Sequence, residues 1–253
     1  MGHLQPVSVI CQREFIRFFR VKSRWLGALA RPLIWLVLVG NGLNAIVRPQ
    51  GPYTYLQSIF PGIIAMTIMF SAILSSATIV WDREFGFLRE MLVAPVSRGA
   101  IVLGKAVAGT LISVLQAMLV LLLAPLLGLP VTAGQAASLL VASLFISFCV
   151  TSMGILISAC IRTFDGYNLV MNFLVMPLFL LSGAMYPVAS MPLPLRLASL
   201  CNPVTYCVDV FKHILLGAGK KGPEFLLVQD LAIVAALSAL AIALAALAFR
   251  RKD

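Results

Sequence analysis

The sequence predicts an all-α membrane protein that crosses the bilayer six times, and two observations carry this prediction. The stretch Ala106–Ile161 contains 56 residues without one Lys, Arg, Asp, Glu or His. A hydrocarbon core about 30 Å thick is crossed by roughly 20 apolar residues in a helix, so this stretch suffices for two spans. The composition agrees, because 61% of the 253 residues are hydrophobic, 11% are charged and the mean hydropathy is +1.02. Soluble domains carry about 25% charged residues.

Six apolar segments follow one another along the chain, and each is long enough to cross as a helix. We expect a single membrane domain over residues 1–253, with no room for a second sizeable soluble domain. The fifth span is expected to be broken or kinked at Pro177. The spans are expected at about 25–47, 56–80, 107–128, 136–160, 167–186 and 231–249.

The basic residues predict the orientation. Fourteen Lys and Arg residues fall on the side of the two termini, and five fall on the other side. Because basic residues are concentrated in cytoplasmic loops, both termini are expected in the cytoplasm. An even number of spans requires the same arrangement. The net charge of +10 is therefore explained by topology, and no nucleic-acid partner is expected.

The first 24 residues predict a cytoplasmic interface helix. Between residues 7 and 22, apolar residues such as Phe15 and Phe19 alternate with charged ones, as in a helix lying in the membrane interface. The charged residues of interest are Arg13, Glu14 and Arg17. A simple positively charged anchor would show a similar pattern, and the two interpretations are compatible.

Residues 81–105 form the only sizeable polar loop expected on the cytoplasmic side. Phe85, Leu88 and Leu92 recur at the spacing of one helical face, and Pro95 would stop that helix. Charges of both signs favour docking to a protein, because a lipid-binding surface would be mostly basic. A solvated loop helix is the alternative.

Residues 187–230 are expected outside, yet they are too apolar for an exposed loop. They should re-enter the membrane or pack as short helices over the spans, where protein shields the backbone. Pro203 marks a break, and residues 205–216 could form a short interfacial helix. Cys201 and Cys207 share this segment and could form a disulfide or remain unpaired.

Several kinds of chemistry are missing from the sequence. It contains no HExxH, GxSxG or P-loop pattern, so no catalytic site, metal site or cofactor is expected. The predicted spans contain no acidic residue for an ion relay, so energy for uphill transport would have to come from a partner. Asn168 and Asn172 share a helix face and could line a pathway or contact a neighbouring helix or second copy. Gly154 and Ser158 are expected to allow close helix packing.

Two stretches carry a family resemblance. Residues 83–98, followed by Leu103-Gly104-Lys105, resemble the loop between the second and third spans of type-2 ABC export permeases, a group that includes daunorubicin-exporter-like and nodulation-factor-exporter-like subunits. Residues 181–187, Met191-Pro192 and 202–209 resemble the family's fifth-span and external-loop pattern. The external motif residues are Gly183, Pro187, Asn202, Pro203 and Tyr206.

The resemblance implies a complex in the cell's inner membrane. It would contain two copies of this chain, as a homodimer, and two copies of a cytoplasmic ATPase that holds ATP and Mg. The loop helix would be the coupling helix that docks into the ATPase, and the interface helix would brace the same contact. The implied coupling residues are Arg83, Glu84, Phe85, Gly86, Leu88, Arg89, Glu90, Pro95 and Arg98.

The resemblance also implies export out of the cytoplasm. The third, fourth and sixth spans contain no Trp or Tyr, which sugar pathways commonly use. The expected substrate is therefore hydrophobic or amphipathic, such as a drug-like molecule, a lipid or a lipo-oligosaccharide. A polysaccharide-exporting permease and a membrane scaffold or regulator that binds an ATPase without transport are the alternatives, and an enzyme is the third.

Overall fold

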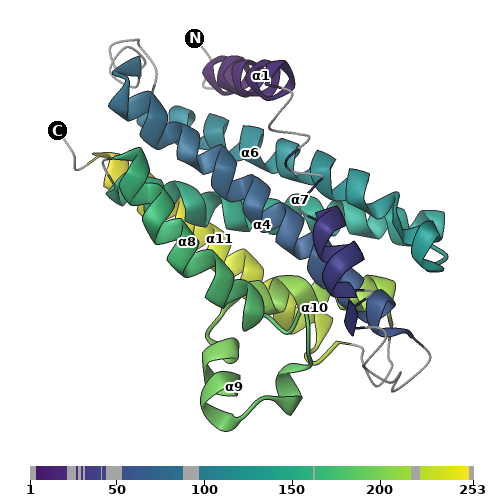
Figure 1. Ribbon diagram of the computed structural model, residues 1–253. Coiled ribbons are helices and arrows are strands. Elements are labelled where there is room, and N and C mark those ends of the chain that lie inside the picture. The colour runs from purple at the N-terminus through teal and green to yellow at the C-terminus, as the bar shows by residue number, and fades with distance from the viewer. Residues whose placement is uncertain are drawn as a thin grey trace.

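A computed structural model of the chain describes residues 4–21, 27, 30, 32–40, 42–43, 53–87, 97–161, 163–217 and 223–250. These residues form helices and the turns between them, with no strand in the described ranges. The longest helices run alongside one another as a bundle (Figure 1).

Four described helices are long and apolar enough to cross a membrane. They are α4 (Tyr55–Glu84), α6 (Arg98–Leu121), α7 (Ala133–Cys160) and α11 (Leu227–Arg250). A fifth apolar helix, α8 (Phe164–Leu180), is shorter, at 17 residues. Helix α4 is mostly buried in the bundle, whereas α11 exposes most of its apolar surface. The prediction of an all-helical protein with several membrane spans is confirmed.

The first predicted span is described only in part. Its described core is a π-helical segment, η1 (Trp35–Gly40), preceded by helical residues 32–34. Ten of the 23 residues 25–47, including Arg31, lie outside the described residues. Six crossings therefore stay a prediction, while each of the second, third, fourth and sixth predicted spans overlaps one of the four long helices.

Three helix boundaries differ from those expected. Helix α6 ends at Leu121 rather than near residue 128, and a 3-10 helix, η2 (Ala124–Leu127), with Pro125 in its first turn, follows it. Helix α6 begins at Arg98 rather than near residue 107, because the Ser97 hydroxyl accepts a hydrogen bond from the Ala100 amide at 3.2 Å and caps the helix. The end of the predicted 81–105 loop is therefore helical. Helix α8 continues for three residues past Pro177 and ends at Leu180. Gly183, with φ of +74°, then reverses the chain.

The segment after α8 consists of short helices. They are η3 (Val188–Ser190), α9 (Leu193–Leu200) and α10 (Pro203–Leu215). Helix α9 is mostly exposed, whereas α10 is almost entirely buried and packs against α4, α7 and α11. Re-entry of this segment into a membrane stays a prediction.

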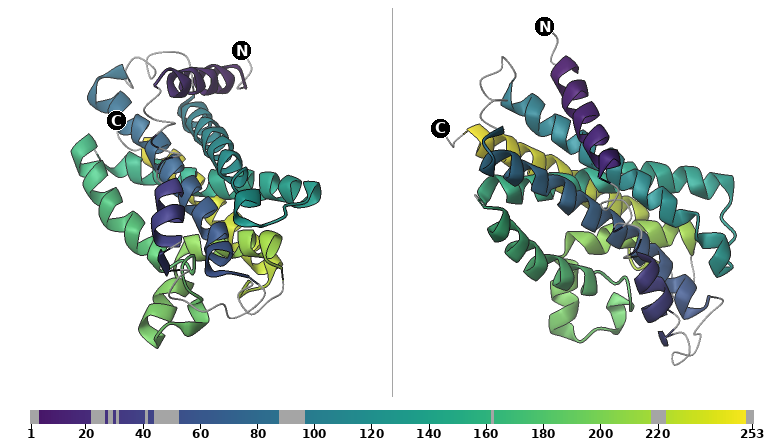
Figure 2. Two further views of the ribbon diagram at one scale, coloured as in Figure 1. Left: turned by 45° about the vertical axis from the view of Figure 1, so that its right-hand side comes forward. Right: turned by 45° about the horizontal axis from the view of Figure 1, so that its top comes forward.

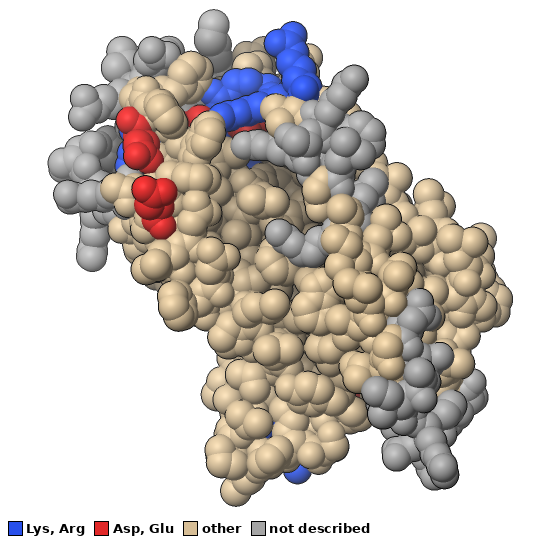
Figure 3. Space-filling model, in the orientation of Figure 1, with Lys and Arg blue, Asp and Glu red and all other residues tan. Residues whose placement is uncertain are grey.

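The amphipathic helix α1 (Leu4–Arg20) lies across one end of the bundle and packs on α6 (Figures 1 and 2). The C-terminal end of α11 lies at the same end, and α9 lies at the opposite end. On the face shown in Figure 3, described Lys, Arg, Asp and Glu side chains gather near α1, while most of the bundle surface is uncharged. On this face, the charged side chains are therefore concentrated toward the α1 end.

Small residues bring α4 and α7 into close contact. A Cβ atom at Gly154 would lie 2.4 Å from the Ser76 Oγ, and the Ser158 hydroxyl donates to the Ser76 carbonyl at 2.9 Å. The Ser76 hydroxyl is itself held by Tyr167, at 2.7 Å from its phenolic oxygen. The pair Gly154 and Ser158 thus serves close packing, as expected.

Gly154→Ala should destabilise the protein, because the added methyl group must displace a hydroxyl fixed by Tyr167. Overpacking of this kind costs about 1–3 kcal/mol. The measurement is the unfolding temperature of the detergent-solubilised protein. The matched control is Gly134→Ala on the same helix, where a Cβ meets nothing within 4 Å. Equal unfolding temperatures for the two variants would contradict the close packing.

Candidate functional site

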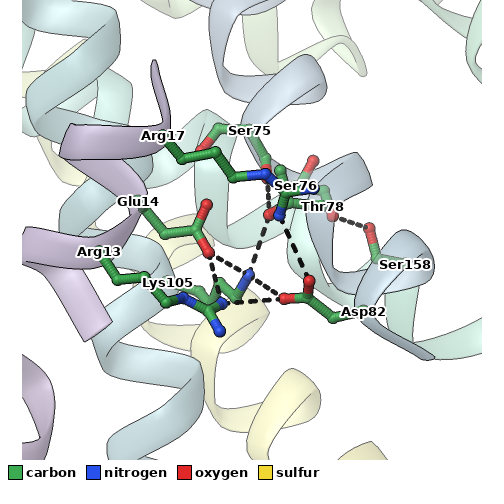
Figure 4. Close-up of polar contacts among 9 residues, drawn as sticks. All are labelled: Arg13, Glu14, Arg17, Ser75, Ser76, Thr78, Asp82, Lys105 and Ser158. Carbon is green, nitrogen blue, oxygen red and sulfur yellow. Dashed lines mark hydrogen bonds and ion pairs between the residues drawn. The ribbon is translucent and has the colours of Figure 1, made fainter. Parts of the chain in front are cut away.

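Five charged side chains meet where α1 crosses the ends of α4 and α6 (Figure 4). Three of them, Arg13, Glu14 and Arg17, are the interface-helix residues singled out from the sequence. The other two are Asp82, in the last turn of α4, and Lys105, in the second turn of α6. We call these five residues the charge cluster.

Lys105 lies at the centre of the charge cluster. Its Nζ donates to the Glu14 Oε1 at 2.6 Å, to the Asp82 Oδ2 at 2.5 Å and to the Thr78 Oγ1 at 3.1 Å. These bonds satisfy all three ammonium protons. The side chains of Lys105, Glu14 and Asp82 are only 3%, 4% and 6% exposed. One buried cation therefore joins α1, α4 and α6.

Two arginines close the charge cluster on its outer side. The Arg13 Nη2 donates to the Glu14 Oε1 at 2.7 Å and to the Asp82 Oδ2 at 3.1 Å. The Arg17 Nη1 donates to the Asp82 Oδ1 at 3.4 Å. Both guanidinium groups also lie over aromatic rings, Arg13 at 4.8 Å from the Phe87 centroid and Arg17 at 5.9 Å from that of Trp81.

The buried charges of the charge cluster depend on one another. Burial of the Glu14 carboxyl opposes its ionisation, but the attraction of Lys105 and Arg13 outweighs burial and holds the pKa of Glu14 below its ordinary value. Glu14 is therefore a carboxylate at neutral pH. A buried charge that loses its partner is strongly destabilising, so the three helix ends are held in one arrangement.

The next two residues of α4 face a different pair of helices. The Arg83 Nη1 donates to the carbonyl oxygens of Ser158 at 3.1 Å and Ile161 at 2.6 Å, which lie at the C-terminal end of α7. The Glu84 Oε2 accepts from the Phe164 amide at 2.9 Å, at the start of α8. The end of α4 is thus bound to α1 and α6 on one side and to α7 and α8 on the other.

The described part of the predicted coupling motif continues in an exposed turn. Phe85 is 74% exposed and lies against Trp81, with ring centroids 5.5 Å apart. Gly86 adopts φ of +81°, a left-handed conformation that favours glycine, and Phe87 is also exposed. Arg98 begins α6. Four further predicted coupling residues lie outside the described residues, namely Leu88, Arg89, Glu90 and Pro95.

Comparison with known proteins identifies the chain. The family model described as ABC-2 type transporter matches residues 5–216, which include α1, the charge cluster and the segment through α10. The chain belongs to the ABC-2 type transporter family. It is a multi-pass membrane protein and a transport permease.

Three relatives of this permease illustrate the match. It is 29% identical to ycf38 of Cyanophora paradoxa, which is named as a transport permease, over 83% of this chain and 74% of the relative. It is 26% identical to the inner membrane transport permease YadH of Escherichia coli strain K12, over 86% of each chain. It is 28% identical to nodulation protein J of Rhizobium leguminosarum bv. trifolii, over 85% of this chain and 83% of the relative.

The external motif residues of the permease shape the segment between α8 and α10. The Asn202 amide donates to the Leu178 carbonyl at 2.6 Å, and its side-chain oxygen accepts from the Val204 amide at 3.0 Å, which caps α10. Pro203 occupies the first turn of α10, and the Tyr206 hydroxyl donates to the Leu200 carbonyl at 2.6 Å.

Gly183 and Pro187 shape the same segment nearer to α8. Gly183 supplies the positive φ and a close approach to Val188, and Pro187 precedes η3. Cys201, exposed, and Cys207, buried, are both free.

Other predicted residues lie apart from the charge cluster. Asn168 is half-buried and Asn172 exposed on α8, beside the strongly exposed Leu169 and Phe173.

Sequence reasoning missed Asp82 and Thr78 and placed Lys105 in a solvated loop. The sequence did hold a signal for this pair. Asp82 directly follows one long apolar run and Lys105 directly precedes another, so both belong at the ends of spans.

A separate, small cavity of about 50 Å³ lies among α4, α7, α8 and α10. It is lined almost entirely by apolar atoms, since methionine, aliphatic and cysteine side chains dominate its wall. Lining residues include Met69, Ile73, Met153, Met171, Leu174 and Val204.

Lys105→Gln should destabilise the permease, because Glu14 and Asp82 would then share a buried site without the central cation. Losing one partner of a buried ion pair costs about 3–5 kcal/mol. The measurements are the unfolding temperature and the rate of proteolysis within α1. The control is Arg20→Gln on α1, where the side chain is exposed. A Lys105→Gln protein as stable and protease-resistant as this control would refute the central role of Lys105.

Proposed function

We propose that this permease is the membrane subunit of an ATP-driven exporter and that the charge cluster transmits movement from a separate ATPase to the spans. The observation that carries the proposal is the dual attachment of the end of α4. Asp82 binds Lys105 and the arginines of α1, while Arg83 and Glu84 bind the ends of α7 and α8. A force applied just beyond residue 84 would therefore reach five helices directly.

The exposed turn after α4 suits a protein docking surface. Phe85 and Phe87 present aromatic rings at the charged end of the molecule, where Arg13 and Arg17 supply cations and Glu84 supplies an anion. Exposed aromatic residues that enter a partner's pocket commonly dominate binding energy. We assign this turn, together with the motif residues through Arg98, to the contact with an ATPase subunit present in two copies and holding ATP and Mg.

A second permease copy would complete the complex. Helix α8 exposes Leu169, Phe173 and Met176 along one side, with Asn172 on the same exposed helix. Apolar surface of this extent faces either lipid or another membrane helix. We assign the Asn172 region to the contact between two identical permeases, where an amide can hydrogen-bond across helices.

The substrate proposal rests on the apolar cavity. Its wall of methionine and aliphatic side chains offers almost no polar partner, and the flexible methionines could widen this small space for an apolar group. We therefore propose a hydrophobic or amphipathic cargo, such as a drug-like molecule, a lipid or a lipo-oligosaccharide. Movement would be outward across the inner membrane, with both termini and the α1 end in the cytoplasm.

Phe85→Ala tests the docking surface. Removing the exposed ring should reduce co-purification of an ATPase with tagged permease from native membranes in mild detergent. A dominant interface aromatic is worth about 2 kcal/mol or more, which corresponds to roughly a thirtyfold loss of affinity. The matched control is Leu126→Ala, which truncates another exposed apolar side chain in the α6–α7 connection.

Three results of the pull-down decide between the functions. Loss of a P-loop ATPase in Phe85→Ala alone supports the proposal, and its hydrolysis rate should rise when cargo is added to the wild-type complex. Recovery of an ATPase without cargo stimulation would indicate a scaffold or regulator. Equal recovery with both variants, or no ATPase from wild type, would refute the docking assignment.

A further inference from the structure

Three side chains with metal-binding chemistry meet where α10 contacts the start of α11. Asp209 and His213 are four residues apart on α10 and share a face, and Asp230 lies in the first turn of α11. One ligand atom from each residue lies within 4.8 Å of the others. The His213 Nε2 is 3.6 Å from the Asp230 Oδ2 and 3.9 Å from the Asp209 Oδ2.

Asp230 supplies an independent reason to look for a ligand. Its side chain is 0% exposed, and neither carboxylate oxygen accepts a hydrogen bond within the part of the chain that the structure describes. Asp209 differs, because its oxygens accept from the Glu224 and Phe225 amides at 2.9–3.0 Å. A buried polar group left without a partner is costly, so Asp230 requires a cation or a proton in the space beside His213.

Acidic groups outnumber basic ones among the described residues of this region. They are the three carboxyl groups of Asp209, Glu224 and Asp230 and the ammonium group of Lys212. The Lys212 Nζ lies 3.9 Å from the Glu224 Oε1, and the backbone amide of the same Glu224 donates to Asp209.

We propose that Asp209, His213 and Asp230 form a binding site for a divalent cation of the Zn²⁺ class. Imidazole nitrogen and carboxylate oxygen are ordinary zinc ligands, at about 2.0–2.2 Å. In the structure the His213 Nε2–H donates to the Phe225 carbonyl oxygen at 2.9 Å, so a bound cation would take the place of this proton and leave the imidazole protonated on Nδ1. Small side-chain movements would bring the two carboxylates into range.

The position of the site suggests what the ion does. His213 is partly exposed, so an ion can enter from solvent. The ligands come from α10, from the turn at residues 224–225 and from α11. An ion bound there would fasten the segment after α8 to the last long helix, at the end of the bundle opposite α1.

Metal titration of the intact permease tests the proposal. The protein is purified through a tag without histidine, treated with a chelator and titrated with ZnCl₂ by calorimetry. Co²⁺ is then used as a spectroscopic probe of nitrogen and oxygen ligation. We expect one ion per chain, and loss of measurable binding in His213→Ala and Asp230→Asn.

The chain offers a matched control, because His3 is its only other histidine. His3→Ala should bind zinc as wild type does. Absence of zinc binding by wild type, or equal binding by His213→Ala and His3→Ala, would overturn the proposal. The unfolding temperature gives a further test. If it depends on pH in wild type but not in His213→Ala, and does not respond to ZnCl₂, the site holds a proton rather than a metal ion and the proposal is wrong. The Co²⁺ spectrum of wild type tests the site even if a variant fails to fold, because it must show ligation by nitrogen and oxygen atoms.

Discussion

The ammonium group of Lys105, buried between two carboxylates, is the interaction on which the arrangement of the α1 end depends. Glu14 and Asp82 come from different helices, and the buried ammonium group pairs with both carboxylates. The amphipathic helix α1 is consequently fixed to the bundle by charge as well as by the apolar face that contains Phe18. A helix held in this way cannot slide in the membrane interface independently of α4 and α6.

The remaining contacts extend this constraint through the bundle. Arg83 and Glu84 attach the same helix end to α7 and α8, and the Gly154 contact keeps α7 against α4 further along. The opposite end is organised differently, because Asn202 and Asp209 bind backbone groups and fold the chain after α8. One end of this permease is therefore held together by ion pairs, and the other is built around a buried short helix.

Much of the fold could be predicted because long apolar runs have few alternatives to membrane helices. The uncharged stretch Ala106–Ile161 indeed forms most of α6 and α7. The partners of the charged residues could not be predicted, because Lys105 and Glu14 are 91 residues apart in sequence. Lys105 was assigned to a loop since the helix start set by the Ser97 cap was not recognised. Asp230 was likewise assigned to the external segment rather than to the sixth span, because it directly precedes the apolar run that forms α11.

The central claim is that α1, α4 and α6 move as one unit when the permease works. Gly104 on α6 faces Ile10 on α1, and a Cβ atom at residue 104 would lie 3.0 Å from the Ile10 Cβ. Ile10→Cys with Gly104→Cys, in a protein whose five native cysteines are replaced, should therefore form a disulfide. The account predicts that the cross-linked complex retains substrate-stimulated ATP hydrolysis at the rate of the reduced protein. Loss of that stimulation on oxidation, with recovery on reduction, would show that α1 must separate from α6 and would contradict the account.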